Sequence, residues 1–148
     1  MMFIGSDHGG LQLKDSIAAF LKERGIDFKD CGTFDASSVD YPDYAEMVAG
    51  AVSRGEVETG ILICGTGIGI SIAANKFPQV RAALVTDSFM AQMAKEHNNA
   101  NILVLGGRIT NPETGREIVA AWLDATFEGG RHQGRLDKIA ALEKRCCN

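Results

Sequence analysis

The sequence predicts a single α/β domain built on a doubly wound parallel sheet. Its 148 residues fit one domain, since domains commonly hold about 100–200 residues. Short apolar runs alternate with segments of helical periodicity, which is typical of parallel βαβ units. Three of the runs are almost continuously apolar, as strands buried on both faces are. We therefore expect a Rossmann-like sheet of five parallel strands in the order 2-1-3-4-5, with helices on both faces.

Five short apolar runs are the expected strands, and each ends quickly in a turn-forming or polar residue. The second run is weak and mixed, and Arg81 interrupts the fourth. In chain order the expected strands cover residues 1–5, 26–31, 60–64, 80–85 and 102–105.

Helical spacing fills the gaps between these strands. Leu13 and Ile17 begin an apolar stripe that Gly25 ends, as a glycine after a helix commonly does. Asp87 and Asn111 are typical N-caps for two later helices. The expected helices after the first cover residues 43–53, 71–76, 87–94, 112 to the break at 129–130, and about 132–144. No composition shift marks a domain boundary, so residues 1–148 are expected to form one domain.

Composition and charge exclude several classes of partner. The net charge of −4 argues against nucleic-acid binding, which needs a basic excess, and leaves no polybasic face for a membrane. The apolar runs are far shorter than the roughly 20 residues of a membrane-spanning helix. The first residues lack the basic start of an export signal, so we expect a cytoplasmic protein. The four cysteines are then expected to be reduced thiols; they are Cys31, Cys64, Cys146 and Cys147.

Two glycine-rich segments follow the first and third expected strands, at residues 5–10 and 64–69. In a doubly wound sheet these strand ends flank the ligand-binding crevice. The second segment fits neither the dinucleotide nor the P-loop spacing. It still places a run of backbone N–H groups at a helix start, which favours an anion. The alternative is that the glycines serve tight turns only.

Candidate chemical groups lie in and beyond these segments. Cys64 sits shortly before a helix start, where the helix dipole favours a thiolate; the alternative is an inert buried cysteine. His97 precedes the fifth strand, although a histidine there is often only a helix-end charge. Arg131 and Arg135 are four residues apart and share one helix face. They are suited to grip a phosphate, or they form a solvated basic helix start.

Five motifs in this order resemble the ribose-5-phosphate isomerase B family, which includes galactose-6-phosphate isomerase subunits. The resemblance covers residues 3–144, and its most specific part is the stretch from Cys64 to Lys76. Some members use a glutamate further along that loop as the base, whereas this sequence has the cysteine type. The motifs are Asp7-His8-Gly9-Gly10, Asp40-Tyr41-Pro42, Cys64 to Lys76, His97-Asn98, and Gly129-Gly130-Arg131-His132 with Arg135.

The resemblance implies a role for each matching residue. Cys64 is the base that moves a proton between C2 and C1 of the sugar, and His97 helps to open the sugar ring. The implied catalytic residues are Cys64, His97, Thr66 and Asp7. The implied substrate-binding residues are Asp7, His8, Tyr41, Gly65, Thr66, Gly67, Ile68, Gly69, Asn98, Arg108, Arg131 and Arg135, of which the three arginines hold phosphate. No metal and no cofactor is implied.

The predicted chemistry is therefore a metal-free aldose–ketose isomerisation through an enediolate. It needs a base, donors for the developing oxyanion and a grip on the remote phosphate. The preferred substrate pair is ribose 5-phosphate and ribulose 5-phosphate. A hexose 6-phosphate, such as that of allose or galactose, and a non-catalytic phosphosugar-binding module remain alternatives. A flavodoxin-like electron carrier is disfavoured, because it needs a Ser- and Thr-rich phosphate loop after the first strand.

The expected topology separates two groups of these residues. Asp7 and Cys64 end their strands at the carboxyl edge of the sheet, whereas His97 precedes the fifth strand at the opposite edge. A five-residue strand spans roughly 17 Å, beyond the reach of a histidine side chain. We therefore expect a homodimer, or a dimer of dimers, with shared active sites, and the last helix, about 132–144, to pack on the partner. Which subunit supplies Arg108, Arg131 and Arg135 stays open.

Overall fold

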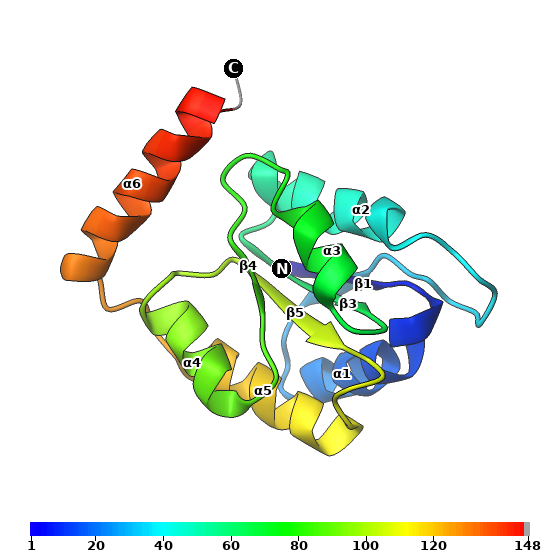
Figure 1. The fold of residues 1–148 in the computed structure, drawn as a ribbon. Helices are drawn as coiled ribbons and strands as arrows, with labels where there is room; N and C mark the ends of the chain where they lie inside the picture. Colours follow the sequence, from blue (N-terminus) through cyan, green and yellow to red (C-terminus); the bar gives the residue numbers. More distant parts are fainter. Residues whose placement is uncertain (147–148) are drawn as a thin grey trace.

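The computed structural model describes residues 1–146 and shows one parallel sheet covered by helices on both faces (Figure 1). Cys147 thus lies outside the described residues. The strands are β1 (Met2–Ser6), β2 (Phe28–Asp30), β3 (Thr59–Cys64), β4 (Ala82–Leu84) and β5 (Ile102–Gly106). The helices are the 3-10 turn η1 (His8–Gly10), α1 (Leu11–Glu23), α2 (Tyr41–Ser53), α3 (Ile68–Ala74), α4 (Ser88–Glu96), α5 (Pro112–Asp124) and α6 (Arg131–Cys146).

The predicted fold class is confirmed, but the last two strands are placed differently from the prediction. The order is β2-β1-β3-β5-β4, not 2-1-3-4-5. All five residues of β5 are buried, as a strand paired on both sides requires. β4 has only three residues, and each is partly exposed. A short, half-buried strand suits the edge of a sheet, so β5 takes the interior position.

Two apolar cores lie on the two faces of the sheet, and β3 contributes to both. Ile61 and Ile63 pack with α1, α4 and α5 on one face, where Trp122 is fully buried. Leu62 and Cys64 pack with α2 and α3 on the other. The strict alternation follows from the two-residue period of a strand. It places the Cys64 side chain on the α3 side of the sheet.

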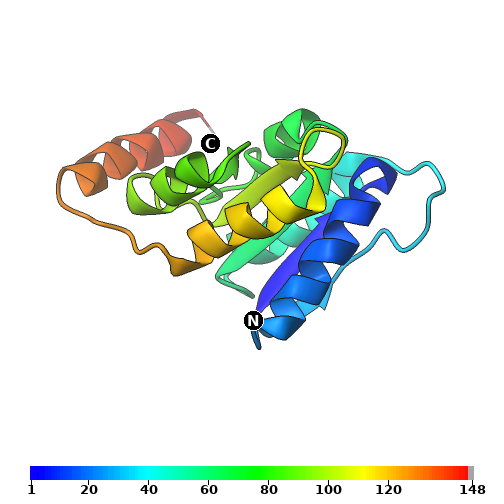
Figure 2. The same ribbon diagram turned by 90° about the horizontal axis from the view of Figure 1, so that it is seen from below.

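Helix α6 lies at one side of the molecule, beyond α4 and the β4 edge, rather than on a face of the sheet (Figures 1 and 2). Its Glu143 accepts a hydrogen bond from the Gln79 N–H at 2.9 Å. Ile139 and Leu142 remain about half exposed. Helix α5 ends at Asp124, before the predicted break at residues 129–130. None of the described helices is both long and apolar enough to cross a membrane.

Candidate active site

Three loops meet at the carboxyl ends of β1, β3 and β5. A Cβ atom on Gly9 would lie 3.2 Å from the Gly65 Cα atom, and one on Gly107 would lie 2.5 Å from the Gly9 carbonyl oxygen. The contact at Gly107 leaves no room for a side chain, and the contact at Gly9 is tighter than a side chain normally makes. The glycines therefore let three backbones touch, and the residues beside them are brought into one place.

Asp7 and His8 are fixed at the end of β1. Asp7 is 7% exposed, and its Oδ1 accepts the Gly10 N–H at 3.1 Å. The Nδ1 atom of His8 accepts the Val39 N–H at 3.2 Å. Since Nδ1 is an acceptor, a neutral His8 carries its proton on Nε2. One imidazole nitrogen is thus committed to the fold and the other is left for a ligand.

The loop after β3 begins with Cys64, which is 4% exposed. Gly67 has a φ of 79°, and a Cβ atom there would lie 2.5 Å from Leu84 Cδ1, so this position requires glycine. The turn lets α3 begin at Ile68, three residues earlier than predicted. The Thr66 hydroxyl accepts the Ile68 N–H at 3.2 Å. Cys64 and the start of α3 are therefore held by one short turn.

Two further predicted residues border this loop. Tyr41 begins α2, and a Cβ atom on Gly69 would lie 2.6 Å from the Tyr41 ring. Arg108 donates its backbone N–H to the Gly65 carbonyl at 2.9 Å, and its guanidinium covers Gly65. The structure thus brings together the members of what we name the carboxyl-edge cluster: Asp7, His8, Tyr41, Cys64, Gly65, Thr66, Gly67, Ile68, Gly69 and Arg108.

The other predicted residues, His97, Asn98, Arg131 and Arg135, form a second group, which we name the amino-edge cluster. His97 is the C-cap of α4 and lies five positions before the first residue of β5. The register pairs Gly60 with Ile102 and Cys64 with Gly106. The amino-edge cluster therefore lies near the Gly60 end of β3, and Cys64 lies at the other end. The four residues between these ends span about 13 Å, so the two clusters do not meet within one chain.

His132 is a feature of the amino-edge cluster that the sequence analysis did not select. It is 4% exposed, and its ring stacks on that of His97 with centroids 4.1 Å apart. Its Nε2 lies 3.5 Å from a Glu128 carboxylate oxygen. The sequence offers one signal that points to His132, namely its position directly after Arg131 in the glycine-arginine-histidine motif.

One group of potential metal ligands occurs among the described residues, formed by His97, Glu128 and His132. Imidazole lone pairs lie in the ring plane, and the two rings are almost parallel, with an angle of 13° between them. Stacked rings direct their lone pairs side by side rather than toward one ion. The group therefore fits mutual positioning of the two histidines and not metal coordination.

The burial of His132 beside His97 makes the free energy of unfolding depend on pH. Burial, then the neighbouring His97 and Arg131 charges, lower the pKa of His132, with Glu128 opposing and Arg135 adding to the effect. As pH falls below the ordinary value of about 6.5, the unfolded chain takes up this proton before the folded one, and the free energy of unfolding decreases. We expect Tm to fall less between pH 7 and pH 5.5 in His132→Asn than in the original protein. Parallel Tm curves in thermal melts would contradict this assignment.

Comparison with known proteins shows that the chain is a sugar-phosphate isomerase with an α/β fold. The family model described as Ribose/Galactose Isomerase matches residues 2–139, and the chain belongs to this family. It is 51% identical over 141 residues to ribose-5-phosphate isomerase B of Escherichia coli K12, covering 95% of each chain. The resemblance read from the five motifs is thus confirmed.

Solved structures agree over almost the whole chain. Ribose-5-phosphate isomerase B of Clostridium thermocellum matches with a TM-score of 0.95 and 56% identity, covering 97% of each chain. The enzyme of Mycoplasma genitalium, solved with bound ribulose-5-phosphate, matches with a TM-score of 0.93 and 46% identity, covering 97% of this chain and 95% of that one.

Proposed function

We propose that the protein interconverts ribose 5-phosphate and ribulose 5-phosphate through an enediolate. The observation that carries the proposal is the carboxyl-edge cluster, in which a thiol, a carboxylate, an imidazole and a guanidinium surround a glycine loop. The match to a relative solved with ribulose-5-phosphate supports the choice of a pentose.

Each group of the cluster has a part in the proposed reaction. Cys64, as a thiolate, takes the proton from C2 of the open aldose, so that an enediolate forms. A proton then passes from the O2 hydroxyl to O1, and Cys64 returns its own proton to C1 to give the ketose. Backbone N–H groups of residues 65–69 stabilise the developing oxyanion. Asp7 and His8 hold the sugar, and Thr66 and Tyr41 line its site. The proposed reaction requires no metal or cofactor.

The remaining groups come, in this proposal, from a second copy of the chain. His97 opens the sugar ring, Asn98 binds a sugar oxygen, and Arg131 and Arg135 hold phosphate together with Arg108. The separation of the two clusters along β3 supports this arrangement. So does α6, whose half-exposed Ile139 borders an unfilled groove of about 260 Å³ beside the β4 edge. The proposed assembly is a homodimer with α6 packed on the partner.

The phosphate role of Arg131 gives a prediction with an internal control. Arg131 is exposed at the start of α6, so its replacement leaves no cavity. Arg131→Ala should lower kcat/KM for ribose 5-phosphate by at least ~10-fold, since hydrogen bonds to charged groups contribute about 1.5–3 kcal/mol. Any weak activity on unphosphorylated ribose should hardly change. An equal loss on both sugars in steady-state assays would indicate a structural role instead.

The substrate itself is tested by one assay. Incubation with ribose 5-phosphate, allose 6-phosphate and galactose 6-phosphate in the presence of chelator should give the highest kcat/KM for ribose 5-phosphate. The description of the matching family includes galactose, so a hexose 6-phosphate is the second candidate. A higher kcat/KM for either hexose would transfer the proposal to that substrate, and no turnover of any sugar would overturn it.

A further inference from the structure

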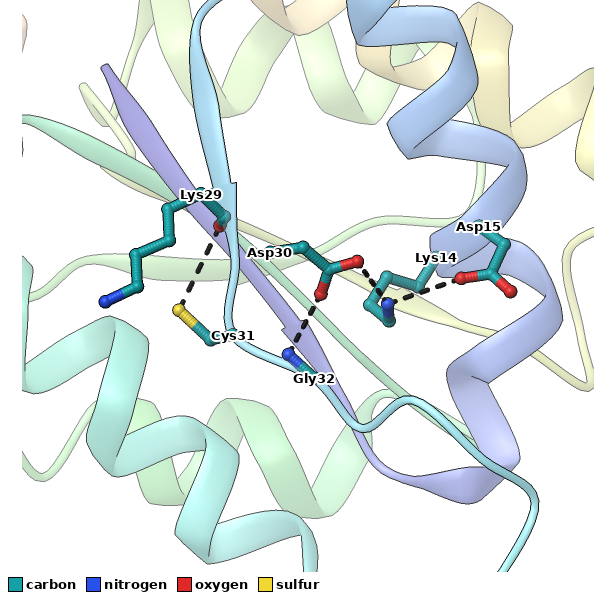
Figure 3. A network of polar contacts seen from close by, with 6 residues as sticks. All are labelled: Lys14, Asp15, Lys29, Asp30, Cys31 and Gly32. Carbon is teal, nitrogen blue, oxygen red and sulfur yellow. Dashed lines mark hydrogen bonds and ion pairs between the residues drawn. The ribbon is translucent and has the colours of Figure 1, made fainter.

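One fully buried charge lies outside both clusters. Lys14 is in the second turn of α1, and its side chain is 0% exposed. Its Nζ lies 2.6 Å from Asp30 Oδ2 and 3.3 Å from Asp15 Oδ1 (Figure 3). It also lies 5.2 Å from the centre of the Phe34 ring. Burying an ammonium is costly, and an ion pair seldom repays more than that cost. Net stability alone therefore does not explain a lysine at this position.

The partner of Lys14 starts the segment that leads to the site. Asp30 ends β2, and its second carboxylate oxygen accepts the Gly32 N–H at 2.9 Å (Figure 3). The chain then runs along β1, where the Ser6 N–H donates to the Gly32 carbonyl and the Thr33 N–H to the Ser6 carbonyl, each at 2.7 Å. Asp30 thus fixes the direction of the chain beside the residue that precedes Asp7.

The far end of the same segment touches the site directly. The Val39 N–H donates to His8 Nδ1, and two residues later Tyr41 packs on Gly69. Residues 31–40 are therefore held by Asp30 at one end and by His8 at the other. Lys14 contacts the first anchor, and α1 itself begins directly after His8, Gly9 and Gly10.

We propose that Lys14 is a positioning residue for the sugar site. Its ammonium fixes the Asp30 carboxylate, which sets the path of residues 31–40 and keeps Val39 in place to select the Nε2–H form of His8. The effect is expected on substrate binding, because the relay ends at His8, which holds the sugar in the proposed function. This inference rests on the proposed function, since it deepens the role of His8 there.

Kinetics separate this role from a purely structural one. Lys14→Met, which is similar in length and uncharged, should raise KM for ribose 5-phosphate about 10-fold and change kcat less than 2-fold, the pattern of lost ground-state binding. The matched control is Asp15→Asn. Asp15 also contacts Lys14, but its side chain is 65% exposed, and its hydrogen bond and ion pair go to Lys14 and not to residues 31–40, so KM should not change.

A second variant keeps the proposal testable if Lys14→Met alone does not fold. Lys14→Met with Asp30→Leu removes both charges and leaves no unpaired buried ion, and it should show the same rise in KM. A KM unchanged in the folded variants, or a kcat that falls while KM stays constant, would overturn the proposal.

A spectroscopic readout does not depend on turnover. The ¹⁵N shifts of the His8 ring at mildly alkaline pH should report the Nε2–H form in the original protein and a mixture of both forms in the variants. An original protein without isomerase activity would overturn the proposed function alone, and the His8 shifts would still decide the positioning role. A single Nε2–H form in all variants would contradict it.

Discussion

Cys64→Ala is expected to lower kcat for ribose 5-phosphate by at least ~10²-fold, the low end of the effect of removing a general base. The substitution removes one sulfur atom from a side chain at the end of β3, where Gly65 and Gly67 fix the loop independently of it. The fold and the substrate-binding groups should persist. Calorimetric titration with ribose 5-phosphate should therefore still detect binding while turnover is lost.

The protein offers its own control for this experiment. Cys146 is an exposed cysteine near the end of α6, and Cys146→Ala should keep the original kcat. Iodoacetamide should inactivate the protein by alkylating Cys64, and substrate should slow that reaction. The assignment of Cys64 as base is wrong if Cys64→Ala keeps more than half of the original kcat.

The strands and helices were predictable because their signals are local. The runs at residues 60–64 and 102–105 are buried strands, and both glycine segments follow strands as expected. The order of the last two strands was not predictable in this way. The edge or interior position of a strand depends on hydrogen bonds to distant segments, and the runs at residues 80–85 and 102–105 are both apolar. The difference between the two strands is visible only in the folded chain, where β4 is partly exposed and β5 is fully buried.

The candidate site was likewise predictable from the sequence only in part. The convergence of Asp7 and Cys64 follows from strand direction alone, and so does the separation of His97 from them. Two contacts did not follow from spacing. Lys14 reads as one charge on an amphipathic helix, and its burial depends on Asp30 of the neighbouring edge strand. In the sequence His132 is part of a basic helix start. Its stacking on His97 depends on the connection back to α4, where the Glu128 N–H donates to the Glu96 carbonyl.

In the assembly that we propose, each active site combines the carboxyl-edge cluster of one chain with the amino-edge cluster of another. Cys64→Ala and His97→Ala each damage one cluster, and each protein alone should be nearly inactive. When the two are unfolded, mixed in equal amounts and refolded, half of the dimers contain one chain of each kind. In every such mixed dimer one site carries both lesions and the other carries none.

The decisive measurement is the ribose 5-phosphate isomerase activity of that refolded mixture. Random pairing leaves one site in four intact, so about a quarter of the original activity should return. Native mass spectrometry of the same sample verifies that mixed dimers have formed. Recovery of about a quarter is expected if the active sites are shared between chains. If mixed dimers are present and no activity returns, every site lies within a single chain and the account is contradicted.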